Sequence, residues 1–457
     1  MKKIISVAAA VSIAAGMLTG CGEKKNETLK VRVWSAEGAT KSFMTEKVDE
    51  FNRTTGAEKG INIEYQVIAS NMSDMAKSAF ENNDGPELVG CSFNDALQYR
   101  KKGYIIPIND LAGGEEYLKT IDYDIPDVSF YAQDGKTYLQ PISTVTGGLV
   151  YNKDLFKKAG IVDENGEALP PKTWDEFVED AKKIHDMDKT KYGTAFPMKD
   201  GTVWWCGMGW ATSASYNRAS YIDLDKQEIV RGENSTMTLD IMMRVKADNS
   251  CFPGSESLDN DTMRLQFAEG NIGMFLGCSW DVGVLTDQFP AKCDWGVAEY
   301  PVKNIGERYK QNGMVGGTLS IGNSAVKTEE MSKAVMEVYK FLYSDDMICE
   351  LYENEFAVPY NTKIAGKADT SKISPQWKAF CDMMKVTREP VEEIKYKIEG
   401  DSANVVNERV WMGQISIKEA SDDINKRTTD ALKKGLADGS IDPEVIKKNQ
   451  SLDYRIK

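Results

Sequence analysis

The chain is poor in residues that build metal sites. Among its 457 residues there is a single histidine, His185, which excludes any site that needs several histidines. The sequence also contains no Cys-x-x-Cys pair and no EF-hand loop. We therefore expect no metal ion and no other cofactor.

Basic blocks and long apolar runs are also scarce. The net charge is −14, and it becomes −16 if Lys2 and Lys3 are removed with a leader. An acidic chain without a basic block is a poor partner for nucleic acid or for anionic lipid. Beyond the first twenty residues no apolar run reaches about 18 residues, so we expect no spanning helix there.

Cysteine is present in an arrangement that argues against a disulfide framework. Of the eight cysteines, one follows the apolar leader and seven are scattered without close pairs. A disulfide framework normally has an even count. The pattern favours small, buried, free thiols, although it does not decide whether any two of them pair.

The N-terminus has the form of a secretory signal. A short basic start is followed by an apolar run over residues 4–18, and then by Leu18, Thr19, Gly20 and Cys21. We predict a signal peptide over 1–20. The segment resembles a bacterial lipobox, which implies lipidation of Cys21, a tether over 21–28 and attachment to the outer face of the cell membrane. The alternative is an ordinary cleaved signal with a chance cysteine.

The first hundred residues alternate between strand and helix patterns. Alternating apolar residues predict strands over 29–34, 61–67 and 87–91. Amphipathic spacing predicts helices over 41–55, ending at Gly56, and over 72–82 and 95–102. The order βαβαβ is typical of an open, mostly parallel sheet covered by helices, which makes the chain an α/β protein.

Polar side chains follow these strands where each strand ends. Ligands bind such sheets at the carboxyl ends of the strands. The residues selected by this rule are Trp34, Glu37, Asn71, Asn94 and Asp95. The alternative interpretation is that Asn71, Asn94 and Asp95 cap the helices they precede.

Further elements follow along the chain. Asp134 and Gly135 predict a hairpin turn, and residues 149–152 predict a strand. Thr173 and Glu176 form a capping-box pattern at the start of a helix. A helix is also expected over 331–344, and the last eighty or so residues are polar and mostly helical in pattern.

Residues 203–210, VWWCGMGW, stand out because three of the nine tryptophans fall here. Two glycines separate them, which a helix or strand interior disfavours. Adjacent residues cannot face the same way in either element. The stretch is therefore either an aromatic piece of core or a surface that holds a flat ligand.

Several longer segments resemble a known family. "GKTYLQPISTVTGGLVYNKDLFKKAGI" (135–161), "PPKTWDEFVEDAKKI" (170–184) and "FAEGNIGMFLGCSWDVG" (267–283) resemble the family 1 extracellular solute-binding proteins of bacterial ABC importers, which include maltose-binding protein. The resemblance covers nearly all of residues 29–360 in order. From about 365 onward the chain is not diagnostic of the family.

The resemblance implies a two-lobed periplasmic-binding-protein-like fold of type II, with the ligand in a cleft between the lobes. One lobe would hold residues 29–142 and 303–345, and the other 145–299 and 350–457. Chain crossings would lie near residues 141–144, 300–302 and 344–349. Binding would shift the lobes by a hinge motion.

The same resemblance implies the ligand and part of the site. A lipid-anchored monomer would bind a carbohydrate and deliver it to ABC permease subunits, without catalysis. Sugars present apolar faces for aromatic rings and hydroxyl edges for carboxylates and amides. The residues that match family positions, or stand beside them in the chain, are Thr144, Trp280, Asp281 and Gly317. We also expect Trp204 or Trp205 to reach the ligand, and Trp210 to belong to the core.

Two other functions remain open at this point. The first is binding of a non-sugar solute such as an amine or a peptide, since a carboxylate-rich aromatic cleft also suits a cation. The second is a surface glycoside hydrolase, which needs two carboxylates across the scissile bond. No sequence motif identifies any two of the 70 acidic residues as a catalytic pair.

Overall fold

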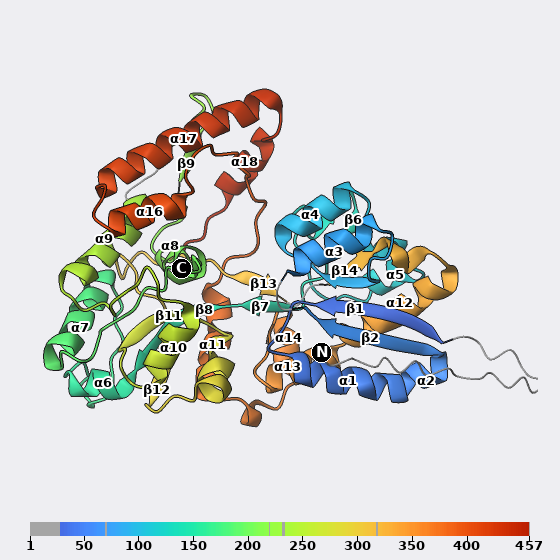
Figure 1. Ribbon diagram of the computed structural model, residues 1–457, viewed down its shortest axis with the longest axis horizontal. Coiled ribbons are helices and arrows are strands. Elements are labelled where there is room, and N and C mark those ends of the chain that lie inside the picture. The colour runs from blue at the N-terminus through green and yellow to red at the C-terminus, as the bar shows by residue number, and fades with distance from the viewer. Residues whose placement is uncertain (1–27, 69–70, 219, 231–233, 317–318, 457) are drawn as a thin grey trace, which may run out of the picture.

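The computed structural model describes residues 28–456, except for 69–70, 219, 231–233 and 317–318, and it leaves the side chains of 93, 94, 230, 234 and 235 undescribed. The chain forms two lobes that lie side by side, with β7 (Ser143–Val145) and β13 (Met314–Gly316) between them (Figure 1). The expected signal peptide and the tether up to residue 27, with Cys21, lie outside the described residues.

The first lobe is built on a five-stranded sheet. Its order is β2 (Ile61–Val67), β1 (Leu29–Ser35), β3 (Leu88–Gly90), β14 (Leu319–Gly322) and β4 (Ile105–Ile106). Strands β1, β2 and β3 are parallel, which confirms the predicted βαβαβ order. Strand β14 comes from late in the chain and pairs antiparallel with both β3 and β4.

Helices cover this sheet. They are α1 (Lys41–Arg53), α2 (Thr55–Lys59), α3 (Met72–Glu81), α4 (Phe93–Lys101), α5 (Gly114–Leu118) and α12 (Glu329–Leu342). The predicted helix end at Gly56 is wrong, because the chain breaks at Thr54 and resumes as α2 up to Gly60, whose φ is 68°. A Cβ on Gly56 would lie 2.6 Å from the Ile61 carbonyl oxygen, so this glycine permits a close approach.

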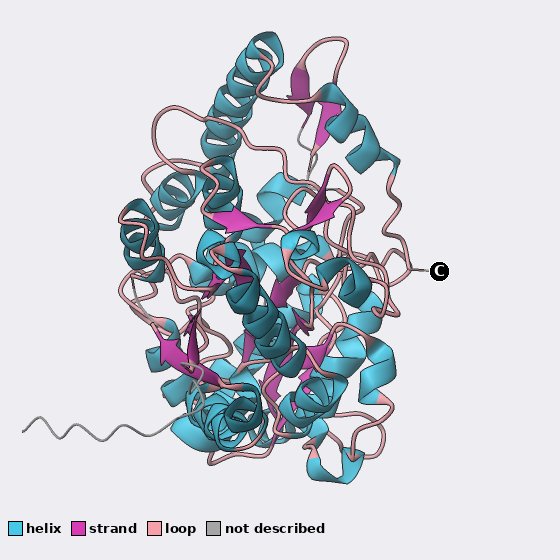
Figure 2. Cartoon of the chain, turned by 90° about the vertical axis from the view of Figure 1, so that its right-hand side faces the viewer, coloured by secondary structure: helices cyan, strands magenta, loops and turns pink. Residues whose placement is uncertain are grey.

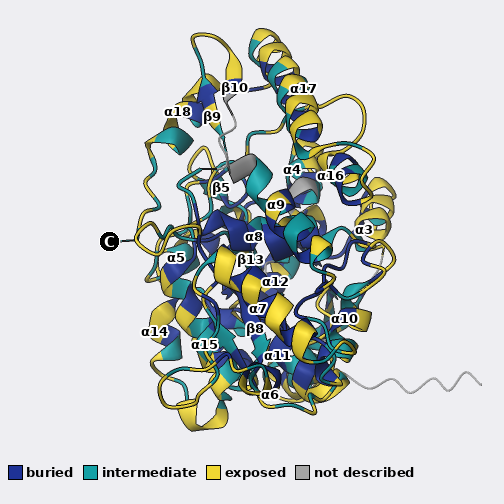
Figure 3. Cartoon of the chain, turned by 90° about the vertical axis from the view of Figure 1, so that its left-hand side faces the viewer, coloured by how far each residue is buried: buried dark blue, intermediate teal, exposed yellow. Residues whose placement is uncertain are grey.

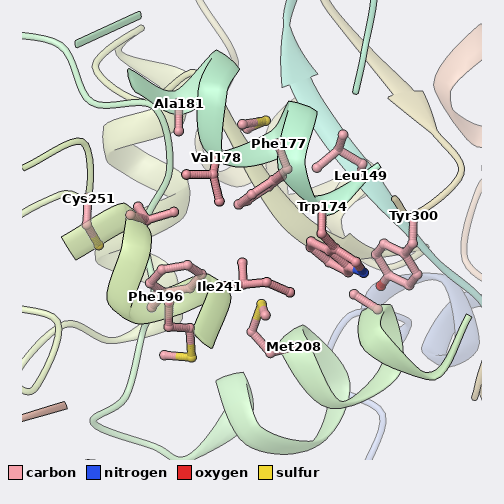
Figure 4. Packing of buried hydrophobic residues seen from close by; sticks show 14 of the residues in the cluster. Leu149, Trp174, Phe177, Val178, Ala181, Phe196, Met208, Ile241, Cys251 and Tyr300 are labelled. Carbon is pink, nitrogen blue, oxygen red and sulfur yellow. The ribbon is translucent and has the colours of Figure 1, made fainter. Parts of the chain in front are cut away.

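The second lobe has a three-stranded antiparallel sheet with β8 (Gly147–Asn152) between β11 (Met274–Cys278) and β12 (Trp295–Ala298). Its main helices are α6 (Lys153–Lys158), α7 (Trp174–Met187), α8 (Met208–Ser213), α9 (Asn234–Ala247), α10 (Asn260–Ala268) and α15 (Pro375–Asp382). The predicted capping box of Thr173 and Glu176 opens α7. Trp174 and Phe177 of α7 are buried in the core of this lobe (Figure 4).

A second small sheet joins the lobes. Strand β7 lies between β13 and β15 (Val358–Pro359), and Thr144 pairs with Val315 on one side and Val358 on the other. Strand β13 therefore belongs to this joining sheet. Residues 303–313 hydrogen-bond to the second lobe, for example through Gln311 N–H to the Val386 carbonyl at 2.7 Å.

The polar tail predicted after residue 365 folds as helices on the second lobe. These are α16 (Ala403–Trp411), α17 (Ile417–Asp438) and α18 (Pro443–Ser451), beside the hairpin of β9 (Tyr221–Asp223) and β10 (Glu228–Val230). Val406, Val410 and Ile424 pack with Leu239 of α9 in one buried cluster. The helix α17 carries a long exposed face (Figure 3). In the molecule as a whole, helices largely surround the strands, which are magenta in Figure 2.

The remaining elements are short. They are β5 (Ala132–Gln133), β6 (Lys136–Thr137), α11 (Asp281–Gly283), α13 (Asp345–Glu353), α14 (Thr362–Ala365), two π-helical turns (Val203–Gly207 and Val284–Gln288) and the 3₁₀ turns Ile108–Asp110, Asn323–Val326, Thr370–Lys372 and Met383–Val386. Strands β5 and β6 form the hairpin predicted at Asp134 and Gly135. Within the described part of the chain, no helix has the length and apolar character needed to cross a membrane.

Candidate ligand site

The loops that follow β2 and β3 lie together at one edge of the first lobe, as expected for parallel strands. The Ser73 hydroxyl donates to one oxygen of Asp95 at 2.7 Å, and the Ser92 hydroxyl donates to the other oxygen at 2.5 Å. Ser92 also caps α4 by accepting from the Asp95 N–H. The Asp95 carboxylate therefore links the first turn of α3 to the first turn of α4.

The other predicted residues at this edge differ in how the fold uses them. Asn71 is exposed, has a φ of 59° and makes no side-chain capping bond to α3, so its amide is open to solvent. Trp34 is half-buried against a cluster that includes Phe80 and Tyr99. Glu37 is exposed. For Asn94 the structure describes only its backbone in α4.

Thr144 lies in the sheet that joins the lobes. Its side chain is buried, and its hydroxyl has no hydrogen-bond partner among the described residues. An unpaired buried hydroxyl has a free-energy cost, which makes it available to a ligand or a water molecule. Gly317, predicted to face the same region, lies outside the described residues.

In the second lobe the three tryptophans of residues 203–210 have different environments. Trp205 is 47% exposed, Trp204 is half-buried between two hydrophobic clusters, and Trp210 is 6% exposed. The rings of Trp205 and Trp210 meet edge to face, with centroids 5.7 Å apart. The expectation that Trp210 belongs to the core is confirmed, and Trp205 is the indole that presents a surface to solvent.

Of the two glycines in residues 203–210, Gly207 and Gly209, one is needed for steric reasons. Val203–Gly207 is a π-helical turn that runs directly into α8. A Cβ on Gly209 would lie 2.3 Å from the Trp204 carbonyl oxygen, whereas a Cβ on Gly207 would meet nothing closer than 3.7 Å. Gly209 is thus required for the close packing of α8 on the turn that carries Trp204 and Trp205.

Trp280 and Asp281 follow strand β11, and the fold uses them differently. Asp281 is 2% exposed, pairs with the Arg264 guanidinium at 2.6 Å and accepts from the Cys278 N–H at 2.7 Å. Burial raises the pKa of the Asp281 carboxyl above its ordinary value, and Arg264 opposes that rise. Asp281 thereby fixes the turn that carries the half-buried Trp280.

A small cavity of about 30 Å³ lies beneath this turn. Cys206, Cys278, Trp280 and Asp281 are among its lining residues. Such a volume has room for one or two water molecules and is too small for a sugar ring.

Metal and disulfide chemistry find no support in the part of the chain that the structure describes. No group of three or more histidine, cysteine, aspartate or glutamate side chains is placed to hold a metal ion there. The seven described cysteines are free thiols. Burial raises the pKa of the Cys251 thiol to about 12, so this thiol stays protonated and unreactive at neutral pH.

Comparison with known proteins identifies the family. A family model described as a bacterial extracellular solute-binding protein matches residues 35–347. The chain belongs to this family. It is an extracellular solute-binding protein and not an enzyme, which confirms the family and the class of function expected from the sequence motifs.

Solved structures with the same fold support the two-lobed architecture. The GacH receptor of Streptomyces glaucescens, solved unliganded and with acarbose, matches 90% of this chain and 99% of its own with a TM-score of 0.66 and 19% identity. The maltose/maltodextrin-binding domain of Bdellovibrio bacteriovorus, bound to maltotriose, matches 90% of this chain and 100% of its own, with a TM-score of 0.63 and 18% identity. The predicted fold class is confirmed.

Curated relatives share less of the sequence. An sn-glycerol-3-phosphate-binding periplasmic protein of Rhizobium meliloti is 23% identical over 360 residues, which cover 75% of this chain and 78% of the relative. Three Brucella proteins are 27% identical over 239 residues, and the chain spans about half of their length. These levels of identity leave the solute open.

Proposed function

We propose that the protein binds a carbohydrate between its lobes and delivers it to the membrane subunits of an ABC importer. The sugar would stack on indole rings, and carboxylate and amide groups would receive or donate hydrogen bonds at its edges. A lipid on Cys21 would hold the protein, as a monomer, at the outer face of the cell membrane.

The exposure of the Trp205 ring is the observation on which this proposal depends. Its ring is 47% exposed, yet Trp210 supports it from the core at a centroid distance of 5.7 Å. A large indole left half in solvent, with its edge-to-face neighbour in the core, can serve as a platform for a flat apolar face. In the first lobe, the half-buried Trp34 and the exposed Asn71 would supply a second ring and an amide.

The division into lobes fits the same proposal, with one boundary moved. Residues 303–313 hydrogen-bond to the second lobe, so we propose that the first lobe takes up the chain again at Met314. The buried hydroxyl of Thr144 lies in the strand that both lobes share. A ligand between the lobes would therefore have Thr144 at the floor of its site.

The second candidate solute is sn-glycerol 3-phosphate, which a relative of 23% identity is named for binding. A phosphate requires several cationic or N–H donors. The proposed site residues are instead aromatic, amide, hydroxyl and carboxylate groups, which suit the hydroxyls of a neutral sugar. The chemistry of the site thus favours the carbohydrate.

Thermal-shift measurements test the solute. Monosaccharides, oligosaccharides, glycerol 3-phosphate and amines are each added to the purified protein, and a ligand that binds the native state raises its Tm. We expect an oligosaccharide to give the largest rise. A rise with glycerol 3-phosphate or an amine alone would reject the carbohydrate.

The Trp205→Ala variant tests the platform. Loss of stacking on one indole should weaken sugar binding about tenfold, equivalent to ~1.4 kcal/mol. Tyr221→Ala is the matched control, because Tyr221 is a similarly exposed aromatic residue, at 52%, on the β9–β10 hairpin. Equal binding by both variants and the wild type would contradict the assignment of Trp205 even if a sugar binds.

A further inference from the structure

The segment 388–399, here called the strap, crosses from the second lobe toward the first. It runs without helix or strand between the 3₁₀ turn Met383–Val386 and α16. It lies beyond residues 35–347, which match the family model. Both of its ends are anchored in the second lobe.

The first anchor is Arg388. Its guanidinium donates to the carbonyl oxygens of Ser213 at 2.9 Å and Tyr216 at 2.7 Å, and also to that of Lys310. The same group stacks over the Tyr454 ring at 4.5 Å. Since these partners all belong to the second lobe, the start of the strap is held there.

The second anchor is hydrophobic. Ile394 and Tyr396 pack against a buried cluster that includes Leu432 of α17 and Ile446 of α18. Between this cluster and Arg388 the strap has only a few residues, and Glu392 stands among them. The position of Glu392 is therefore set by the second lobe.

Glu392 nevertheless binds the first lobe. One carboxylate oxygen accepts from the Ser129 N–H at 2.6 Å, and the other accepts from the Ser129 hydroxyl. Val128 and Phe130, on either side of Ser129, are buried in a hydrophobic cluster of the first lobe. Hydrogen bonds to a charged, partly buried acceptor are stronger than those between neutral groups.

Helix α18 adds to this contact. The Lys448 ammonium lies 3.0 Å from a carboxylate oxygen of Asp127, and the Asn449 amide donates to the Glu392 carbonyl at 2.7 Å. Lys448 and Asp127 are both exposed, so their ion pair contributes little. Of these two contacts with the first lobe, the one that Glu392 makes is the stronger.

We propose that the strap and α18 form a second bridge between the lobes, which restrains the hinge formed by β7, β13 and β15. A lobe attached at the hinge alone can rotate, but contacts at Ser129 and Asp127 favour the arrangement in which they are made. Figure 1 places α18 well away from β7 and β13, so small rotations at the hinge change this contact most. The bridge biases the inter-lobe equilibrium whatever the solute.

The Glu392→Ala variant tests the bridge, with Glu393→Ala as the matched control. Glu393 is the exposed neighbour and carries the same charge. Small-angle X-ray scattering without solute should show a shift to a larger radius of gyration for Glu392→Ala and none for Glu393→Ala. Hydrogen exchange at the Ser129 amide should rise about tenfold, as expected for the loss of a hydrogen bond to a charged group.

A second variant keeps the test independent of folding. Lys448→Glu places like charges at Asp127 on an exposed surface, and Lys447→Glu is its control on the same helix. We expect Lys448→Glu to shift the scattering curve in the same direction as Glu392→Ala but by less, since the exposed pair contributes little, and far-UV circular dichroism to match the wild type. Scattering curves that match those of both controls would overturn the bridge and leave the proposed solute untouched.

Discussion

The ion pair of Asp281 and Arg264 is almost enclosed by the second lobe. The exposed fractions of the two side chains are 3% and 15%, and Asp281 also accepts from a backbone N–H. A buried pair of this kind adds little stability compared with apolar residues, but loss of one partner leaves an uncompensated charge. Its role is to hold the turn that carries Trp280.

The variant Asp281→Asn measures this role. It leaves Arg264 without a buried counter-charge and should lower the free energy of unfolding by about 3–5 kcal/mol. Asp261→Asn is the matched control, because Asp261 contacts the same guanidinium at 3.0 Å but is 68% exposed. The Asp261→Asn variant should lower the free energy of unfolding by less than about 1 kcal/mol. Equal losses in urea denaturation would contradict the structural role of Asp281.

The sequence could suggest Asp281 as a site residue but not its partner. The pairing with Arg264 depends on the packing of α10 against the end of β11, which no local pattern reveals. The same holds for Asp95, because its partner Ser73 lies in α3, more than twenty residues earlier in the chain. Trp210 could be assigned to the core because it lies six positions after Trp204, behind Gly209, whereas the adjacent Trp204 and Trp205 must face different ways.

At the scale of elements, the π-helical turn before α8 requires the backbone at Gly209 to lie very close to the backbone at Trp204. Gly209 approaches the Trp204 carbonyl so closely that any side chain would clash. In such a turn each hydrogen bond spans one residue more than in an α-helix, and these turns occur often at functional sites. The turn sets how Trp204 and Trp205 divide between core and solvent.

The variant Gly209→Ala tests this geometry. The added methyl group should destabilise the protein by about 1–3 kcal/mol and change the tryptophan fluorescence spectrum as Trp205 moves. Gly207→Ala serves as the control, since its methyl group would meet ordinary contacts, and it should stay within about 1 kcal/mol of the wild type. The geometry would be refuted by a Gly207→Ala effect as large as that of Gly209→Ala, measured by chemical denaturation.

Elements with a clear period could be predicted from the sequence, and elements without one could not. Strands β1 and β2 alternate over seven residues each, and α7 has both a capping box and an apolar face. Strand β13 spans three residues, which is too short for any period, so the sequence could not predict this strand. The turn Val203–Gly207 likewise has no pattern that distinguishes it from a helix start.

At the scale of the whole molecule, Arg388 connects segments that are far apart in the sequence. Its guanidinium donates hydrogen bonds to the carbonyl of Ser213 at the end of α8 and to that of Lys310, which precedes β13. The same group lies over the ring of Tyr454, which belongs to the C-terminal tail. Burial lowers the pKa of its guanidinium, which still carries its charge at neutral pH. These contacts tie the tail to the segment that enters the hinge.

The variant Arg388→Ala should leave three partly buried carbonyl groups without the donors that Arg388 supplies. We expect a loss of about 3 kcal/mol in the free energy of unfolding and faster hydrogen exchange at the Lys310 amide, which donates to the Tyr454 carbonyl. The control is Lys385→Ala, whose side chain is 78% exposed and should change stability by less than about 0.5 kcal/mol. Unchanged exchange at Lys310 would show that Arg388 does not hold the tail.

The position of β14 has a consequence for the order in which an exported chain can fold. The sheet of the second lobe uses strands that end by Ala298, so it can assemble once that residue has emerged from the membrane. The sheet of the first lobe needs residues 319–322 between β3 and β4. The lobe that begins first in the chain therefore completes its sheet last, and its early strands must wait with an open edge while the rest of the chain is translocated.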